Sequence, residues 1–192
     1  MPASDAAPLR LTLSEAAAEG FGAADGGVDP AALVAAIAAD LAAEGAAAGD
    51  AAARRAVAVR HLAAARAAEA QRLEAAFAAA PLAARAFVAA QTRLIDGIVT
   101  ASLRTAHLLH PAHAPTAGER IAVLAVGGYG RAELAPHSDL DLLFLFPWKI
   151  TPWAESVIET MLYILWDLRL KLGHASRTVR DCIRLAREDM TI

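Results

Sequence analysis

The sequence predicts an α+β protein in which an Ala-rich helical N-terminal region is followed by a small sheet with flanking helices. Residues 30–117 carry Ala, Arg and Glu, with larger apolar residues at helical spacing. Residues 118–192 instead read strand, strand, helix, strand, helix, which is an α/β-type order. We therefore divide the chain into a mobile N-terminal arm (residues 1–29), a helical region (30–117) and a sheet-containing core (118–192).

Three helices are expected in the helical region. Asp29 followed by Pro30 is typical of an N-cap with proline at the first helical position, and this helix should run to about Glu44. Asp50 can cap a second helix over residues 51–79. Pro81 is expected to start a third helix, whose large apolar residues form one stripe and which should end near residue 111.

The core should contain three strands and two helices. Residues 121–126 and 139–146 are expected to be strands, because both are apolar runs beside turn residues. A long apolar helix is expected over residues 155–172, with Gly173 as its C-terminal break. Residues 174–178 should form a third strand, and 180–187 a last helix. Because three strands make a thin sheet and the sequence stops at Ile192 with no closing element, we expect a fold truncated at its C-terminus.

The composition argues against several classes of protein. Hydrophobic residues make up 57% of the 192 residues, but 52 residues are Ala and 40 of these lie in the first 100. The larger apolar residues are then about 30% of the chain, an ordinary supply for a globular core. The longest run of large apolar residues, 140–148, is too short to span a bilayer, and no secretory signal is visible. A formal net charge of -3 argues against general nucleic-acid binding. We expect a cytoplasmic protein with no membrane and no nucleic-acid partner.

The residues with recognisable chemistry lie in the segment AVGGYGRAELAPHSDLDLLFLF, residues 125–146. An expected strand leads into Gly127 and Gly128, followed by Gly130. Glycine lets a backbone amide approach a ligand closely, and a turn with free N–H groups beside a helix start can hold phosphate. Arg131 follows and could pair with phosphate oxygens. No GxxxxGK[ST] sequence occurs, and the dinucleotide fingerprint is incomplete.

Asp139 and Asp141 come next, with Ser138 directly before them. At positions i and i+2 of a strand, both carboxylates project to one face, and Leu140 and Leu142 to the other. At roughly 6 Å and an effective dielectric of about 20, two such charges repel by about 3 kcal/mol. A divalent cation offsets that repulsion, and Mg²⁺ favours one or two carboxylates with phosphate oxygens and water. The segment therefore indicates a site for a metal-bound nucleoside triphosphate.

The order Gly-Gly, ten residues, then Asp-x-Asp on a strand resembles the nucleotidyltransferase fold of DNA polymerase beta. Within that superfamily, VGGYGRAELAPHSDLDLLFL is similar to the N-terminal catalytic domain of the bacterial PII uridylyltransferase/uridylyl-removing enzymes. LWDLRLKLGHASRT (165–178), LAREDMTI (185–192) and RLIDGIV in the preceding helix are further matches. The resemblance covers residues 85–192 well and the rest of the chain weakly.

The resemblance implies Mg²⁺-dependent transfer of UMP from UTP to a tyrosine of the nitrogen-regulatory protein PII, by in-line attack with release of pyrophosphate. It implies that two catalytic carboxylates, Asp139 and Asp141, hold Mg²⁺. It also implies four nucleotide contacts, which are Gly127, Gly128, Arg131 and Ser138. Three further residues could approach the nucleotide: His137, His174 and Arg177.

The sequence departs from the family pattern in two respects. The complete enzymes continue into a hydrolytic domain with His-Asp metal motifs and then two ligand-sensing domains, and no His-Asp pair occurs here. The superfamily commonly has a third carboxylate on a later strand, which residues 174–178 lack; Asp167 and Asp181 are the available alternatives. Two other functions stay open: a non-catalytic nucleotide-binding regulatory fragment, and an adenylyltransferase of the same superfamily.

Overall fold

The computed structural model describes residues 27–44, 50–111 and 117–188. The elements are α1 (Pro30–Ala43), α2 (Ala51–Ala79), α3 (Ala84–Leu109), β1 (Ala122–Ala125), α4 (Gly127–Gly130), β2 (Leu140–Phe146), α5 (Pro152–Asp167), β3 (Leu172–Thr178) and α6 (Val179–Glu188). The predicted α+β class is confirmed. Most of the predicted N-terminal arm lies outside the described residues. Among the helices that are described, none combines the length and the apolar character needed to cross a bilayer.

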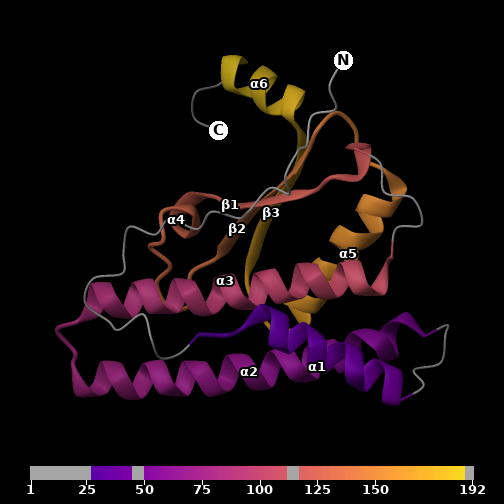
Figure 1. Cartoon of the computed structure of the whole chain (residues 1–192). Coiled ribbons are helices and arrows are strands. Elements are labelled where there is room, and N and C mark those ends of the chain that lie inside the picture. The colour runs from indigo at the N-terminus through magenta and orange to yellow at the C-terminus, as the bar shows by residue number, and fades with distance from the viewer. Residues whose placement is uncertain (1–26, 45–49, 112–116, 189–192) are drawn as a thin grey trace, which may run out of the picture.

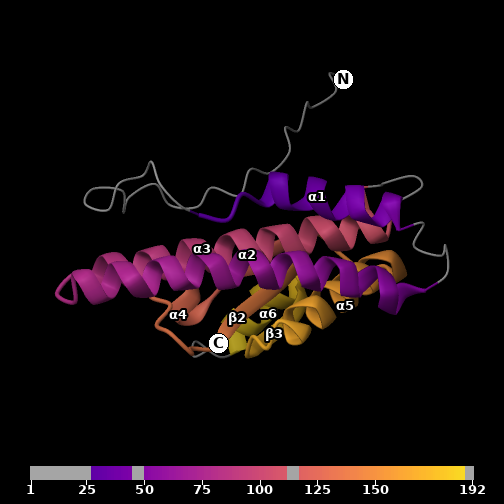
Figure 2. The same cartoon turned by 90° about the horizontal axis from the view of Figure 1, so that it is seen from below.

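Helices α1, α2 and α3 form one layer on one side of the sheet (Figures 1 and 2). The predicted caps start the first two helices. The Asp29 carboxylate accepts hydrogen bonds from two amides of α1 at 2.8 and 3.3 Å, and Asp50 does the same for α2 at 2.9 and 3.2 Å. Helix α3 begins at Ala84 rather than Pro81, because Pro81 and Leu82 belong to the turn that reverses the chain after α2.

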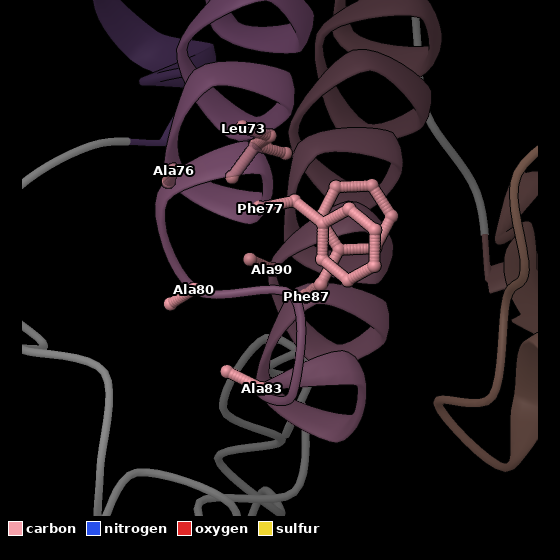
Figure 3. Close-up of a pocket in the computed structure, with 7 residues that line it drawn as sticks. All are labelled: Leu73, Ala76, Phe77, Ala80, Ala83, Phe87 and Ala90. Carbon is pink, nitrogen blue, oxygen red and sulfur yellow. The ribbon is translucent and has the colours of Figure 1, made fainter.

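Two phenylalanines hold this turn between α2 and α3 (Figure 3). The ring centroids of Phe77 and Phe87 are 4.7 Å apart, and their planes are tilted by 40°. Offset and tilted contacts of this kind are favourable for aromatic pairs. Alanines line most of the surrounding hollow, which leaves no room for a water molecule. The hollow is therefore a packing feature and not a binding site.

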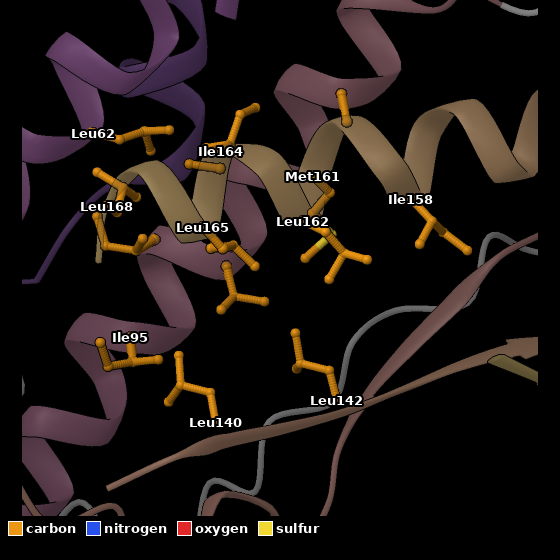
Figure 4. Packing of buried hydrophobic residues seen from close by; sticks show 14 of the residues in the cluster. Leu62, Ile95, Leu140, Leu142, Ile158, Met161, Leu162, Ile164, Leu165 and Leu168 are labelled. Carbon is orange, nitrogen blue, oxygen red and sulfur yellow. The ribbon is translucent and has the colours of Figure 1, made fainter. Parts of the chain in front are cut away.

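The sheet has the strand order β1-β2-β3, with β1 antiparallel and β3 parallel to β2. Burial alternates along β2, and the four buried residues are Leu140, Leu142, Phe144 and Phe146. Figure 4 shows Leu140 and Leu142 pointing from the strand toward α5 and Ile95 of α3. These two helices therefore cover one face of the sheet, and Asp141 belongs to the other face.

Helix α5 differs from the prediction at both ends. The Thr151 hydroxyl caps it by accepting a hydrogen bond from an amide of the first turn at 3.2 Å, so that Pro152 is helical rather than part of a turn. The helix ends at Asp167, because Arg169 adopts a left-handed φ of 57° that the helix cannot continue through. Gly173, which was expected to break the helix, lies inside β3 instead.

The two faces of the sheet give a direct test of the fold. Leu140 is 2% exposed, whereas Leu124 of β1 lies on the opposite face and is 39% exposed. Leu140→Asp buries an unpaired charge, so we expect a loss of several kcal/mol in the free energy of unfolding. Leu124→Asp should change it by about 1 kcal/mol or less. Urea denaturation followed by circular dichroism measures both, and equal losses would contradict the assignment of the faces.

Candidate functional site

The glycine segment forms a single helical turn at the end of β1. Ala125, the last residue of β1, pairs with Leu142, and the Val126 amide donates a hydrogen bond to the carbonyl of Asp141 at 3.0 Å. Helix α4 therefore starts directly beside Asp141. The first amides of a helix have no acceptor within the helix itself, so those of Gly127 and Gly128 are available to an anion.

The carboxylate of Asp141 occupies a space that two glycines leave open. A Cβ atom on Gly127 would lie 2.7 Å from the Asp141 Oδ2 atom, and a Cβ atom on Gly173 would collide with Oδ1. Gly127 also has a φ of 60°, which glycine adopts without strain. The half-buried Asp141 side chain thus lies between the start of α4 and the neighbouring strand β3.

Ser138 and Asp139 lie on the loop that enters β2, and both are exposed. The strand begins one residue later, where the Leu140 amide donates a hydrogen bond to the Lys171 carbonyl at 2.8 Å. Because Leu140 is buried against the helices, its two neighbours are directed away from the core. The structure thus places Asp139 and Asp141 at the same end of the sheet.

Arg131 is tied to the glycine segment. Its Nη1 atom donates a hydrogen bond to the Gly127 carbonyl at 2.9 Å, and its Nε atom pairs with the Glu133 carboxylate at 2.9 Å. The Arg131 and Glu133 side chains are both 66% exposed. Exposed ion pairs of this kind contribute about 0 to 1 kcal/mol, so the guanidinium can exchange Glu133 for another anion at little cost.

The two aspartates are the candidate metal ligands. Within the described ranges, no group of three or more His, Cys, Asp or Glu side chains is placed to hold a metal ion. The two alternatives for a third carboxylate lie elsewhere. Asp167 accepts a hydrogen bond from Arg55 of α2 at 3.0 Å. Asp181 accepts one from the Thr178 hydroxyl at 2.6 Å, at the opposite end of β3 from Asp141. Two carboxylates still suit Mg²⁺, which is commonly completed by phosphate oxygens and water.

The sequence does not reveal that α3 supports this site. The Tyr129 hydroxyl in α4 donates a hydrogen bond to Asp96 Oδ1 at 2.8 Å, and Tyr129 is 4% exposed. Burial raises the pKa of Tyr129, and it also raises the pKa of Asp96 against the opposing effects of this hydrogen bond and of Arg93. The Leu134 amide donates a second hydrogen bond, to Thr92 Oγ1 at 3.4 Å. A buried tyrosine predicts some partner for its hydroxyl, but no spacing in the sequence identifies Asp96.

The three further candidates are spread over different places. His174 pairs with Leu142 on the covered face, where its ring contacts Phe144 and Trp166 with centroids 6.4 and 6.2 Å apart. The structure thus directs His174 away from Asp141. Arg177 pairs with Leu145, on the Asp141 face but toward the far end of the strand. His137 is exposed in the loop before Ser138.

Comparison with known proteins gives related sequences. A family model described as glutamate-ammonia ligase adenylyltransferase matches residues 24–170. A bifunctional uridylyltransferase/uridylyl-removing enzyme of Cereibacter sphaeroides is 62% identical over 139 residues, which is 72% of this chain and 15% of that protein. Proteins of the same name from Ruegeria pomeroyi and Caulobacter vibrioides are 68% identical over 113 residues and 61% over 99 residues, covering 58% and 50% of this chain.

The chain spans only a small part of these relatives, because the matched segments cover 12% of the Ruegeria protein and 10% of the Caulobacter protein. No solved structure matches the chain.

The glycines around Asp141 can be tested by a double-mutant cycle. Gly173→Ala brings a methyl group into the Asp141 carboxylate, so we expect a loss of about 1 to 3 kcal/mol in the free energy of unfolding. Asp141→Ala should remove most of that loss in the double variant, which gives a coupling of about 1 kcal/mol or more. Gly128→Ala is the matched control, because a Cβ atom there has nothing closer than 3.9 Å. Additive losses would contradict the close contact.

Asp96 gives a prediction about pH. Its pKa is raised in the folded state, so the folded protein binds more protons than the unfolded chain above the ordinary value of 3.8. Its contribution to stability is therefore fully present below that value and is lost as pH rises through the raised pKa. Asp96→Asn should become more stable relative to the wild type as pH rises from about 4 to 7. Urea denaturation over this range measures the effect, with the exposed Asp167→Asn as control, and parallel profiles for Asp96→Asn and the wild type would contradict it.

Proposed function

The chain belongs to the glutamate-ammonia ligase adenylyltransferase family of nucleotidyltransferases, and on that premise we propose that it transfers UMP from UTP to a tyrosine of the nitrogen-regulatory protein PII. The observation that carries the proposal is the Asp141 carboxylate, held beside the start of α4 in a space that Gly127 and Gly173 leave open. The name uridylyltransferase/uridylyl-removing enzyme of the relatives supports UTP as the nucleotide.

The chain's own residues have distinct roles in this proposal. Asp139 and Asp141 would hold Mg²⁺, which when bound neutralises charge on the triphosphate and orients it. The amides of Gly127 and Gly128 at the start of α4 bind phosphate oxygens. Arg131 turns from Glu133 toward the triphosphate, since their exposed ion pair is weak. Ser138 adds a hydroxyl from the loop before Asp139.

The transfer step then joins a tyrosine oxygen of PII to the α-phosphorus of UTP. The bond from this phosphorus to the oxygen that bridges to the β-phosphate breaks in line, pyrophosphate leaves, and the phenolic proton passes to water. The acceptor tyrosine comes from the partner protein. Tyr129 cannot serve, because it is 4% exposed and its hydroxyl is bound to Asp96.

An adenylyltransferase is the second candidate, because the matching family model is described as one. The two functions predict different labelled products. Full-length protein is incubated with Mg²⁺ and either labelled UTP or labelled ATP, with PII or glutamate-ammonia ligase as acceptor. Label from UTP on PII supports the proposal, and label from ATP on the ligase supports the alternative. Saturable nucleotide binding without any transfer would favour a non-catalytic regulatory role.

The aspartate pair gives the sharpest test of the proposal. Asp139→Asn and Asp141→Asn in the full-length protein should each lower transfer by at least about 10³-fold, because each removes a metal-binding charge. Both variants should keep the fold, since losing one carboxylate relieves like-charge repulsion. Transfer of labelled UMP and thermal melting are measured together. Asp167→Asn is the matched control, because Asp167 pairs with Arg55 on α2, and it should keep near-normal transfer.

Two results would count against this assignment. Near-normal transfer by the Asn variants would remove the aspartates from the reaction. A loss of transfer that is matched by a loss of folding would make the pair structural.

A further inference from the structure

A second polar site lies on the other side of the loop that carries Ser138 and Asp139. A cavity of about 100 Å³ opens there between α2, α3, the loop that enters β2 and the connection from α5 to β3. Ile95, Leu134, Leu140 and Leu170 are its apolar lining residues. Since a buried water needs about 10 to 15 Å³ of such space, the cavity can hold a small polyatomic ion. Asp139 and Asp141 do not line it.

The polar lining of this cavity is cationic. Arg66 comes from α2, and Arg169 and Lys171 come from the connection before β3, while no carboxylate lines the cavity. Among the described residues, no ion pair involves any of these three cations. Arg66 is held in place by donating a hydrogen bond from Nη1 to the Leu168 carbonyl at 2.7 Å. Three cationic residues thus line one small space, and no carboxylate residue lines it with them.

The backbone at Arg169 adds a second observation. This residue ends α5 in the left-handed conformation, with a φ of 57°, and its amide and the next donate hydrogen bonds to the carbonyls of Trp166 and Leu165 at 2.7 and 3.2 Å. Glycine is the usual residue at this position, because a side chain is strained there. The chain instead places an arginine there, and that arginine lines the cavity.

We propose that this cavity binds a phosphoryl group of a small anion, at a site separate from the carboxylates of Asp139 and Asp141. Arg66, Arg169 and Lys171 supply the charge, and Gln91 and His137, which also line the cavity, supply further hydrogen-bonding groups. Ser138 precedes Asp139 directly, so an anion in the cavity contacts the loop that carries a candidate metal ligand. The binding itself does not depend on the proposed transfer activity.

Isothermal titration of the full chain with inorganic phosphate and with pyrophosphate tests this proposal, at constant ionic strength and without Mg²⁺ or nucleotide. We expect saturable binding with a Kd of about 1 mM or lower for at least one of the two ions. Acetate at the same concentrations should bind more weakly, because it presents fewer acceptor oxygens and less charge. Lys171→Gln should weaken phosphate binding by about tenfold, through the loss of one charge-assisted hydrogen bond.

Arg169→Gly separates a lost contact from lost folding. Glycine relieves the left-handed strain, so the melting temperature should rise by a few degrees while phosphate binding weakens by about tenfold. Lys149→Gln is the matched control, because Lys149 is an exposed cation outside the cavity, and it should bind phosphate like the wild type. Asp141→Asn should also leave binding unchanged if the two sites are separate.

Three outcomes would overturn the proposal. One is the absence of saturable binding by either ion. Another is binding that Arg169→Gly and Lys171→Gln do not weaken. The third is phosphate binding that UTP displaces competitively, which would make the cavity part of the nucleotide site. None of these measurements uses the transfer reaction, so a failure of the proposed function would leave this test intact.

Discussion

The carboxylate of Asp141 lies where three backbone segments converge: β2 itself, the first residue of α4 and the neighbouring strand β3. A Cβ atom on Gly127 or on Gly173 would collide with that carboxylate, so the close spacing of these segments requires two residues without side chains at positions 46 residues apart in the sequence. The connection from β1 into α4 is short, because only Val126 separates the two elements. It brings unpaired amides and an acidic group to one place, which is what a metal-bound triphosphate needs.

Helix α3 keeps this arrangement in place from outside the sheet. Its apolar stripe packs beneath β2 and beside α5, with Leu94, Ile95 and Ile98 almost fully buried. Two polar residues of the same helix bind segments next to the site. Asp96 accepts a hydrogen bond from the Tyr129 hydroxyl of α4, and Thr92 accepts one from the Leu134 amide. The helical layer therefore does more than bury apolar surface. It sets the position of α4 relative to β2, and so the geometry of the candidate site.

Local signals in the sequence predict the helix caps and the alternation along β2, but not the end of α5 or the contact between Tyr129 and Asp96. The caps at Asp29 and Asp50 and the alternation along β2 depend on neighbouring residues, and the structure confirms them. The end of α5 was predicted wrongly, because Leu168 and Leu172 continue the helical spacing of Leu165 and Gly173 resembles a cap. The true stop is an arginine in the left-handed conformation, a residue type that does not signal one. The bond between Tyr129 and Asp96 joins residues 33 positions apart, and only the packing of α4 on α3 selects it.

Residues of opposite charge, Asp139 and Lys171, lie near each other where β2 and β3 begin. Leu140 pairs with Leu172, so Asp139 and Lys171, which precede them, are the next cross-strand neighbours. An opposite charge in that position offsets part of the repulsion between Asp139 and Asp141 when no cation lies between them. Lys171 also lines the cationic cavity. Among the described residues, Lys171 makes no ion pair with Asp139, so its charge stays available to an anion in the cavity. The loop before β2 thus separates a pair of carboxylates from a group of cationic residues, and a ligand of the opposite charge offsets the repulsion within each set.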